Sequence, residues 1–393
     1  MTNHHDTQPG TPAESRRHLL GTSLEAFTAF CAEHDLPAYR AKQVYEWVFR
    51  RGADSFEVMT NLSKPLRAML AEHWVIYTSQ VVQRQESTDG TIKLLLQWPD
   101  RATSECVLIP DDKRRTACIS SQVGCPVGCA FCASGIGGLQ RQLSPGEIVE
   151  QAMRVRSLFN EANDSSEPRT SARAESLRSA SRVHGSAKPD DGLSNIVFMG
   201  LGEPLANYGA TLAAVRIINA DWGMNIGARK ITISTVGLPT QIRKLAREGL
   251  QVNLAISLHA PNDGLRKKLI PWAKKTSVAD LVAAGREFFD VTGREVTLEY
   301  ILLAGVNDTM EHAHELTRVC RRMRCNVNLI RYNPVADLGF ERPDSYAAHR
   351  FAEELRSRGV NVHIRKSRGA DIDAACGQLR RKNAITTPTR ANG

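Results

Sequence analysis

The hydrophobic positions in the first part of the chain recur at helical spacing. They do so from Ser23 to about Trp74, and the apolar side chains of segment 38–51 fall on one face among arginines and lysines. We therefore expect a small basic helical domain over residues 19–77. A charged face of this kind is as typical of a solvated surface as of contact with RNA. The polar residues 1–18 are expected to form a disordered tail.

An alternation of apolar and polar positions follows the helical part. It extends over residues 78–110, and the dipeptide Asp89-Gly90 within it is typical of hairpin turns. This pattern predicts a short antiparallel β extension over residues 78–115.

From residue 116 onward, short apolar runs alternate with helix-length segments. The apolar runs are 116–121, 195–199, 230–235, 252–257, 295–302, 326–332 and 361–365. The helical segments are 144–159, 209–221, 238–249, 278–290, 309–322 and 344–358. Repeated strand–helix units predict an α/β fold with a parallel sheet and crossover helices. About six units favour a partial (β/α)6 barrel over residues 116–380, with a doubly wound sheet as the alternative.

Two segments lack this pattern. Residues 163–192 are rich in Ser, Arg and Ala and contain only Leu177 and Val183 as large apolar side chains. Such a segment cannot bury enough apolar surface to offset its ordering entropy, so we expect a disordered insertion in the barrel. Residues 381–393 are expected to form a frayed tail.

The composition is that of a globular protein. The 393 residues are 42% hydrophobic and 24% charged, which rules out a mostly disordered chain. No apolar run approaches the roughly 20 residues that span a bilayer, and the polar N-terminus lacks the apolar region of a secretory signal. We therefore expect a cytoplasmic protein that does not enter a membrane. The net charge of +9 favours a polyanionic partner such as nucleic acid.

Nine cysteines need an explanation in a reducing compartment, where disulfides rarely stabilise a fold. Cys125, Cys129 and Cys132 form a C-x₃-C-x₂-C motif, and such clustering indicates a metal or redox site. Three thiolates on one loop can hold three irons of a [4Fe–4S] cluster and leave the fourth iron open. The amine and carboxylate of S-adenosylmethionine (SAM) suit that open position, and the motif resembles the signature of the radical SAM superfamily. The alternative is a Cys₄ zinc site that includes Cys118, although zinc sites usually show two separated cysteine pairs.

Polar or glycine residues follow several predicted strands at the point where each strand ends. They are Gly202 and Glu203, Ser234, the run Ser257-Leu258-His259, and Asn333. The carboxyl ends of parallel strands meet at one rim of a barrel, where ligands usually bind. We therefore expect these residues to form one ligand site.

Longer stretches of the chain resemble the RlmN/Cfr family of radical SAM RNA methyltransferases over roughly residues 20–380. The resemblance is most specific near the C-terminus, in Arg-Lys-Ser-Arg-Gly at 365–369 and Asp-Ile-Asp-Ala-Ala-Cys-Gly-Gln-Leu at 371–379. The other stretches that carry it are 40–43, 59–63, 105–110, 118–132, 199–204, 255–263 and 326–334. The pair Arg331-Tyr332 departs from the apolar or proline-containing pair expected there, which bears on substrate contacts and not on the chemistry.

The resemblance implies a role for individual residues. Cys125, Cys129 and Cys132 would bind one [4Fe–4S] cluster. SAM would be contacted by Gly202, Glu203, Ser234, Ser257, Leu258, His259 and Asn333. Cys376 would carry the methyl group, Cys118 would resolve it, and Glu105 would accept a proton.

The implied reaction is methylation of carbon 2 of adenosine. Carbon 2 lies between two ring nitrogens and is too electron-poor to attack the methyl group of SAM. In the family scheme, Cys376 is therefore methylated by a first SAM, and a radical derived from a second SAM takes hydrogen from that methyl group. The methylene radical then adds to the base. Attack of Cys118 on Cys376 forms a disulfide and frees the methylated base.

The implied substrates are an adenosine in the peptidyl-transferase region of 23S rRNA and the adenosine 3′ of the anticodon in tRNA. A flavodoxin or ferredoxin is expected as electron donor, and the protein is expected to be a monomer. Two alternatives stay open. One is carbon-8 methylation of 23S rRNA, as in the Cfr branch of the family, and the other is a non-catalytic, metal-stabilised RNA-binding protein.

Overall fold

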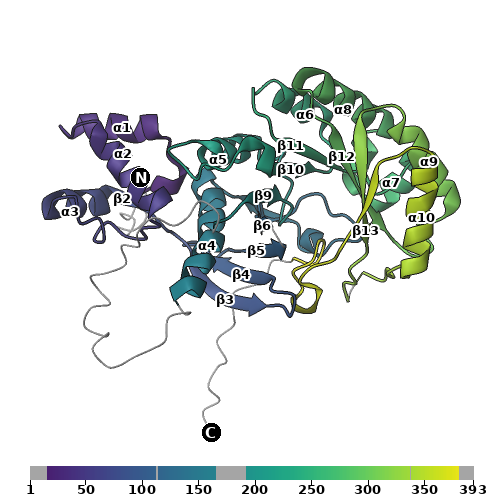
Figure 1. The fold of residues 1–393 in the computed structure, drawn as a ribbon, viewed down its shortest axis with the longest axis horizontal. Coiled ribbons are helices and arrows are strands. Elements are labelled where there is room, and N and C mark those ends of the chain that lie inside the picture. The colour runs from purple at the N-terminus through teal and green to yellow at the C-terminus, as the bar shows by residue number, and fades with distance from the viewer. Residues whose placement is uncertain (1–15, 112–113, 165–191, 337, 380–393) are drawn as a thin grey trace, which may run out of the picture.

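The computed structural model describes residues 16–111, 114–164, 192–336 and 338–379. Figure 1 shows three parts in a row: a helical domain, a group of antiparallel strands, and a larger α/β region. The predicted tails and insertion fall mainly on residues 1–15, 165–191 and 380–393, which lie outside the described residues.

The N-terminal part folds as the helical domain that the sequence pattern predicts. Its elements are β1 (Arg17–His18), η1 (Leu19–Gly21), α1 (Leu24–Glu33), α2 (Tyr39–Tyr45), the π-helical turn η2 (Glu46–Arg50), α3 (Lys64–His73) and β2 (Trp74–Val75). Side chains of Ser23 and Ser63 cap α1 and α3 by accepting a backbone N–H. The predicted tail is too long by two residues, because Arg17 and His18 form β1 and pair in parallel with β2.

The central strands form the predicted β extension. They are β3 (Gln80–Glu86), β4 (Ile92–Gln97), β5 (Thr103–Asp111) and β6 (Arg114–Cys118), and neighbouring strands pair antiparallel. Gly90 has φ 80° in the predicted hairpin between β3 and β4, a conformation that glycine adopts without strain. The extension is continuous with the barrel, because β6 also pairs in parallel with β9.

The remaining strands form the parallel half of one ten-stranded sheet, in the order β14-β13-β12-β11-β10-β9-β6-β5-β4-β3. They are β9 (Asn195–Phe198), β10 (Ile231–Thr235), β11 (Asn253–Ser257), β12 (Val296–Leu302), β13 (Cys325–Arg331) and β14 (Val362–Arg365). The crossover helices are α4 (Pro145–Asp164), α5 (Tyr208–Asn219), α6 (Pro239–Ala246), α7 (Asp263–Leu269), α8 (Val278–Thr292), α9 (Met310–Cys320) and α10 (Ser345–Ser357). The sheet stays open, since β14 and β3 are its two edges, so the prediction of a partial barrel is confirmed.

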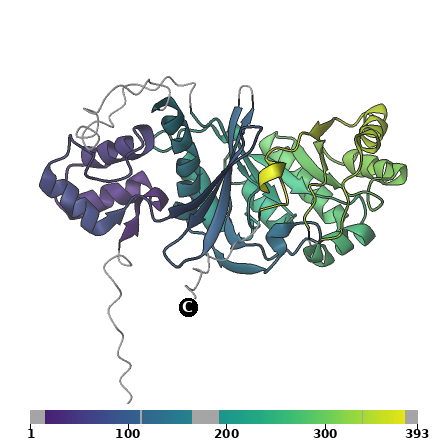
Figure 2. The same cartoon turned by 90° about the horizontal axis from the view of Figure 1, so that it is seen from below.

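Shorter elements lie near the carboxyl ends of these strands. They are β7 (Gln122–Gly124), η3 (Ala133–Gly135), β8 (Leu139–Gln142), η5 (Pro271–Lys275) and η6 (Ala370–Ile372), whereas η4 (Ala228–Lys230) comes directly before the amino end of β10. In Figure 2 the yellow segment that contains η6 lies beside the strands of the β extension, in the middle of the molecule.

The helical domain packs on the barrel through α4 and α5. The buried Glu150 of α4 accepts hydrogen bonds from the backbone N–H groups of Thr78 and Ser79, each at 2.8 Å. The ring of Tyr45 meets that of Trp222 at 5.3 Å between centroids. The apolar residues of the domain and of the barrel belong to one continuous core.

Two boundaries differ from the sequence-based expectation. Residues 163 and 164 were predicted to begin the insertion, but α4 continues through Asp164. Helix ends are set by backbone hydrogen bonds, so an apolar pattern stops short of them. Helix α7 was not predicted, because its seven residues are too few to show a helical period. None of the helices that the structure describes is long and apolar enough to span a membrane.

Candidate active site

The three clustered cysteines lie on one loop, residues 124–132, here called the cysteine loop. It follows β7 just after the carboxyl end of β6. Gly124 has φ 77°, and a Cβ there would lie 2.1 Å from the carbonyl oxygen of Gly138, so the turn needs glycine. The backbone N–H of Ala130 donates to the carbonyl of Leu269 at 2.9 Å, which fastens the loop to α7.

The donor set of the cysteine loop fits an iron–sulfur cluster. All three cysteines line one cavity. Burial raises the pKa of Cys125 to about 12 and also raises the pKa values of Cys129 and Cys132, so a cationic group is needed to make them thiolates at neutral pH. Among the described residues, no three His, Cys, Asp or Glu side chains are grouped to hold a metal ion. In a four-iron cluster, each of the three sulfurs would bind a separate iron and the fourth iron would have no cysteine ligand.

The same cavity collects the predicted rim residues from three strands. Gly202 and Glu203 follow β9, Ser234 lies in β10, and Ser257 and His259 come from the end of β11; all five line it. Gly202 has φ 104°, and a Cβ there would lie 2.6 Å from Gln122. The parallel strands therefore bring the rim residues face to face with the cysteine loop.

Glu203 is a buried carboxylate in a fixed position. Its Oε1 accepts the backbone N–H of Leu205 at 2.9 Å, and its Oε2 accepts that of Val236 at 2.7 Å. Burial raises the pKa of Glu203 to about 7, although these backbone hydrogen bonds oppose the rise. Such a carboxylate is suited to an ammonium group that enters the cavity.

His259 is a neutral hydrogen-bond donor. Its Nδ1 lies 3.1 Å from the backbone nitrogen of Ile301, which has a proton to donate, so the ring proton is on Nε2. Burial, together with the nearby guanidinium of Arg266, lowers the pKa of His259 to about 3. The residue has φ 59°, an uncommon backbone conformation for a non-glycine residue, so the local fold fixes where the ring lies.

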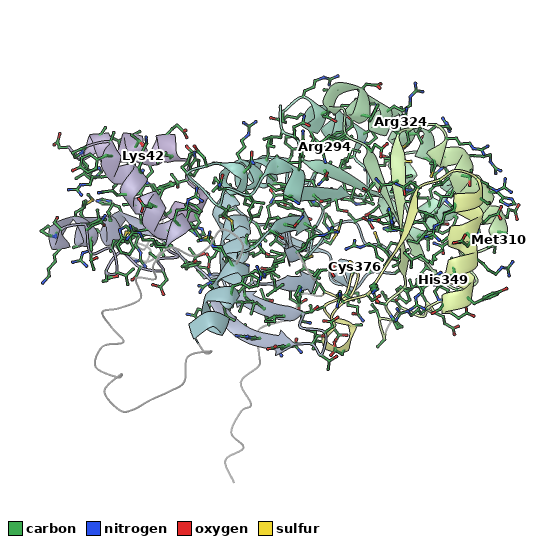
Figure 3. All side chains as sticks on the ribbon, viewed as in Figure 1. Lys42, Arg294, Met310, Arg324, His349 and Cys376 are labelled. Atoms are coloured by element: carbon green, nitrogen blue, oxygen red, sulfur yellow. The ribbon has the colours of Figure 1, made fainter. Side chains whose placement is uncertain are left out.

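Residues 369–379, here called the C-terminal segment, bring Cys376 to this cavity. The N–H of Ala133 donates to the carbonyl of Gly377 at 2.8 Å, and Ser134 Oγ donates to that of Leu379 at 2.7 Å. Asn333 Nδ2 donates to the carbonyl of Cys376 at 3.2 Å. Figure 3 shows Cys376 in the central part of the molecule, away from Lys42 of the helical domain.

The far end of the C-terminal segment is tied to the β3–β4 hairpin. Asp371 accepts a hydrogen bond from Ser87 Oγ at 2.6 Å, and Asp89 accepts the N–H of Gly369 at 3.0 Å. Lys93 Nζ donates to the carbonyl of Asp373 at 3.1 Å. The segment is therefore anchored on both sides of Cys376.

Cys118 lies behind the cavity at the end of β6. It is buried in a small apolar cluster that includes Ala374 and Leu379 of the C-terminal segment. Burial raises the pKa of Cys118 to about 12, and the charge of nearby Cys376 contributes to the rise. The two cysteines are neighbours, and both are free thiols in the structure.

Glu105 does not line the cavity. It is buried in β5, where its Oε1 lies 3.3 Å from Lys93 Nζ. Because Lys93 also donates to Asp373, the Glu105–Lys93 pair lies next to the C-terminal segment. The structure thus links the carboxylate, through Lys93, to the segment that carries Cys376.

Two other predicted site residues do not present a side chain to the cavity. Leu258 faces the apolar core, and its N–H already donates to the carbonyl of Glu299 at 3.0 Å. Asn333 lies beneath the cavity, and its buried Oδ1 has no hydrogen-bond partner among the described residues.

Sequence reasoning missed Arg365 and Glu299, which both line the cavity. The Nη1 of Arg365 lies 3.6 Å from Glu299 Oε2, and nearby Cys376 raises the pKa of Arg365. Arg365 closes the last strand and begins the most specific C-terminal stretch, which was the available signal. Glu299 lies inside an apolar run, and a single carboxylate there does not form a pattern from which a site residue can be predicted.

The cysteine loop, the open parallel sheet and the cavity at its carboxyl edge define a radical SAM protein. Residues 119–317 match the family described as Radical SAM superfamily, and membership implies SAM and an iron–sulfur cluster. Residues 17–76 match the family described as Ribosomal RNA large subunit methyltransferase N-terminal domain. The chain belongs to the RlmN family of dual-specificity RNA methyltransferases.

Full-length relatives carry this assignment. The chain is 42% identical over 375 residues to the "Probable dual-specificity RNA methyltransferase RlmN" of Rhodopirellula baltica, covering 95% of this chain and 94% of that protein. It is 44% identical over 380 residues to the "Probable dual-specificity RNA methyltransferase RlmN 3" of Opitutus terrae, covering 95% and 96%. The crystal structure of a radical SAM methyltransferase from Sphaerobacter thermophilus superposes with a TM-score of 0.83 at 43% identity, covering 92% and 98%. The chain is therefore an enzyme, and the alternative of a non-catalytic RNA-binding protein was wrong.

Proposed function

We propose that this protein methylates carbon 2 of adenosine in the peptidyl-transferase region of 23S rRNA and 3′ of the anticodon in tRNA. The observation that carries the proposal is that Cys376 lines the same cavity as the cysteine loop, with Cys118 buried in an apolar cluster that includes Ala374 and Leu379 of the C-terminal segment. A radical SAM site alone does not need two further cysteines at that place. Methylation of an electron-poor ring carbon needs them, because such a carbon cannot attack SAM by itself; the cysteines do not distinguish carbon 2 from carbon 8, and the choice of carbon 2 rests on the match of the chain to the RlmN family.

The cavity side chains divide into a part for the cofactors and a part for the methyl group. Cys125, Cys129 and Cys132 would hold one [4Fe–4S] cluster, which when bound supplies the electron that cleaves SAM. Glu203 would bind the ammonium of SAM, and Ser234, Ser257 and His259 are suited to its polar groups. Gly202 gives room for close approach of the backbone, Leu258 would contribute backbone groups only, and Asn333 would fix the neighbouring backbone of Cys376.

Cys376 would carry the carbon that is transferred. Its thiolate would attack the methyl group of one SAM, so that a bond forms between the Cys376 sulfur and the methyl carbon, the sulfonium–methyl bond breaks, and S-adenosylhomocysteine leaves. After a second SAM has served to remove one hydrogen atom, the methylene carbon bonds to carbon 2 of the base. The adduct would lose one electron, which returns to the cluster, and its ring proton, which would go to the carboxylate of Glu105; that carboxylate pairs with Lys93 outside the cavity and would have to come within reach of the base. The Cys118 thiolate would attack the sulfur of Cys376 to form a disulfide, the bond between that sulfur and the methylene carbon would break, and the carbon would take a proton to become the methyl group; an external dithiol must reduce the disulfide before the next turnover.

The rest of the molecule would supply contact with RNA and with an electron donor. Lys42 of α2 is exposed and Arg40 is half-buried in the helical domain, and such cations suit backbone phosphates. An unpaired adenosine would have to leave its stack to reach the cavity. We further propose a monomer in the cytoplasm that receives electrons from a flavodoxin or a ferredoxin.

Nucleoside mass spectrometry tests this function. The cluster-reconstituted protein is incubated without oxygen with SAM, a reductant, and unmodified ribosomal or transfer RNA. We expect 2-methyladenosine in both RNAs. Detection of 8-methyladenosine would keep the radical chemistry and overturn the position of methylation. If neither 2-methyladenosine nor 8-methyladenosine forms and the cluster of the protein is intact, the substrate assignment is overturned.

A further inference from the structure

A buried cation without a counter-ion lies beside the cysteine loop. Arg266 of α7 is 1% exposed, one of the most deeply buried large side chains of the molecule. Among the described residues, no carboxylate lies within ion-pair distance of its guanidinium. A charge taken out of water is costly unless an opposite charge compensates it. Arg266 therefore indicates that a negative group belongs next to it.

Backbone carbonyls fix the orientation of the guanidinium. Its Nε donates to the carbonyl of Leu258 at 3.2 Å, and its Nη2 donates to the carbonyls of Val236 and Ser257. These carbonyls come from the ends of β10 and β11, so two edges of the guanidinium are occupied. The remaining Nη1 is buried and has no partner among the described residues. The group is held rigidly, with one donor left for a ligand.

Cys129 is the negative neighbour that the cysteine loop offers. Leu265 and Leu269, which lie on either side of Arg266 along α7, pack in the same apolar cluster as Cys125, Cys129 and Cys132. The contact between Ala130 and Leu269 keeps α7 against the loop. Asp263 lies in the first turn of α7, and its carboxylate already accepts the N–H of Val278 at 2.7 Å.

We propose that Arg266 is a positioning residue for the iron–sulfur cluster: its guanidinium is the counter-ion of the cluster and its thiolates, and Nη1 donates a hydrogen bond to sulfur on the Cys129 side. This inference rests on the cluster in the proposed function. The cluster with three thiolates is negative and gains a further negative charge on reduction. A fixed cation beside it stabilises the reduced state more than the oxidised state. Arg266 therefore raises the reduction potential and makes electron transfer from a weak donor possible.

Three full-length variants test the proposal. Arg266→Gln removes the charge but keeps a donor, and Arg266→Lys keeps the charge but loses the fork that bonds three carbonyls. Arg294→Gln is the matched control. Arg294 comes just before β12, at the amino ends of the parallel strands rather than at the carboxyl ends where the cavity lies, and it bonds Asn253 (Figure 3). Each protein is reconstituted without oxygen and assayed for iron and sulfide. Its midpoint potential is then measured by redox titration with electron paramagnetic resonance of the reduced cluster, without SAM.

We expect wild type and Arg294→Gln to share one potential, Arg266→Gln to titrate at a lower potential, and Arg266→Lys to lie between them. A variant Arg266→Gln that fails to hold iron while Arg266→Lys holds it would also support the charge role. An unchanged potential in Arg266→Gln would overturn the proposal. Loss of iron from both Arg266 variants would overturn it too, because the bonds to the three carbonyls, and not the charge, would then be what the cluster needs. A wild-type chain that assembles no cluster would instead overturn the proposed function, and this inference with it.

Discussion

The cysteine loop and the C-terminal segment both bring cysteines to one cavity, but they are held there in different ways. The loop carries three cysteines within eight residues and turns at glycines such as Gly124. The C-terminal segment carries one cysteine and is anchored to three distant parts of the chain: the β3–β4 hairpin, the residues after β13, and the η3 turn behind the loop.

The difference suits two kinds of task. A cluster needs ligands whose separation does not change, and ligands that lie close together in one short loop keep a constant separation. A residue that takes a methyl group from SAM and then meets both a base and Cys118 has to change partners. Apart from the short η6, the C-terminal segment has no regular structure, so its contacts can open one at a time. We therefore interpret the loop as the fixed side of the site and the segment as its mobile side.

Removal of one cysteine from each region would break this comparison most directly. We expect Cys129→Ala to lose iron, brown colour and activity, because one cluster ligand is missing. We expect Cys376→Ala to keep its iron but to lose methyl transfer by about 10⁴-fold or to background, since no group carries the methyl carbon. Iron analysis and nucleoside mass spectrometry measure both, with Cys325→Ala, remote from the cavity, as control. If Cys376→Ala still methylates RNA, the carrier role is wrong.

A change at Cys118 would sharpen the assignment within the pair. Without the resolving thiol, the bond between Cys376 and the base cannot be broken by disulfide formation. We expect Cys118→Ala to keep its cluster, to complete less than one turnover, and to retain RNA covalently under denaturing conditions. Gel analysis after nuclease digestion and peptide mass spectrometry would locate the adduct. Multiple turnovers by this variant would contradict the role of Cys118.

The pH dependence of SAM binding tests the fixed side of the cavity. Burial raises the pKa of Glu203 to about 7, so the residue is ionised above that pH and neutral below it. If the carboxylate binds the ammonium of SAM, affinity falls as pH decreases through 7, by about tenfold per unit at most. Equilibrium dialysis between pH 6 and 8 measures this, and Glu203→Gln should bind weakly with no such slope. An equal slope in the variant would place the titrating group elsewhere.

A milder change tests the anchoring of the mobile side. Asp371→Ala removes the hydrogen bonds from Ser87 and Thr88, which loosens one end of the C-terminal segment. We expect faster hydrogen exchange in residues 369–379 and roughly tenfold slower methyl transfer, with iron content unchanged. Asp373→Asn is the matched control, since its side chain makes no hydrogen bond that the structure describes. Equal effects of the two variants would contradict an anchoring role for Asp371.

The sheet and most of its helices were predictable because parallel strands leave a periodic pattern. Strand β12, for example, lies within one residue of the predicted run 295–302. Helix α7 and the last turn of α4 were not, since short helices and frayed ends leave no such pattern. The cysteine motif was equally readable, because all of its ligands lie within one loop.

The sequence by itself determined the alternation of strands and helices along the chain, the cysteine loop, and the rim residues at the strand ends. Each of these depends on residues close together in the chain. Only the tertiary structure decided that Cys118 packs against the C-terminal segment, that Lys93 pairs with Glu105, and that Arg266 is buried with its Nη1 unpaired among the described residues. The resemblance to a family suggested roles for Cys118 and Cys376 but gave no position for them. These contacts join residues far apart in sequence, and burial and charge act between neighbours in space, whatever their separation along the chain.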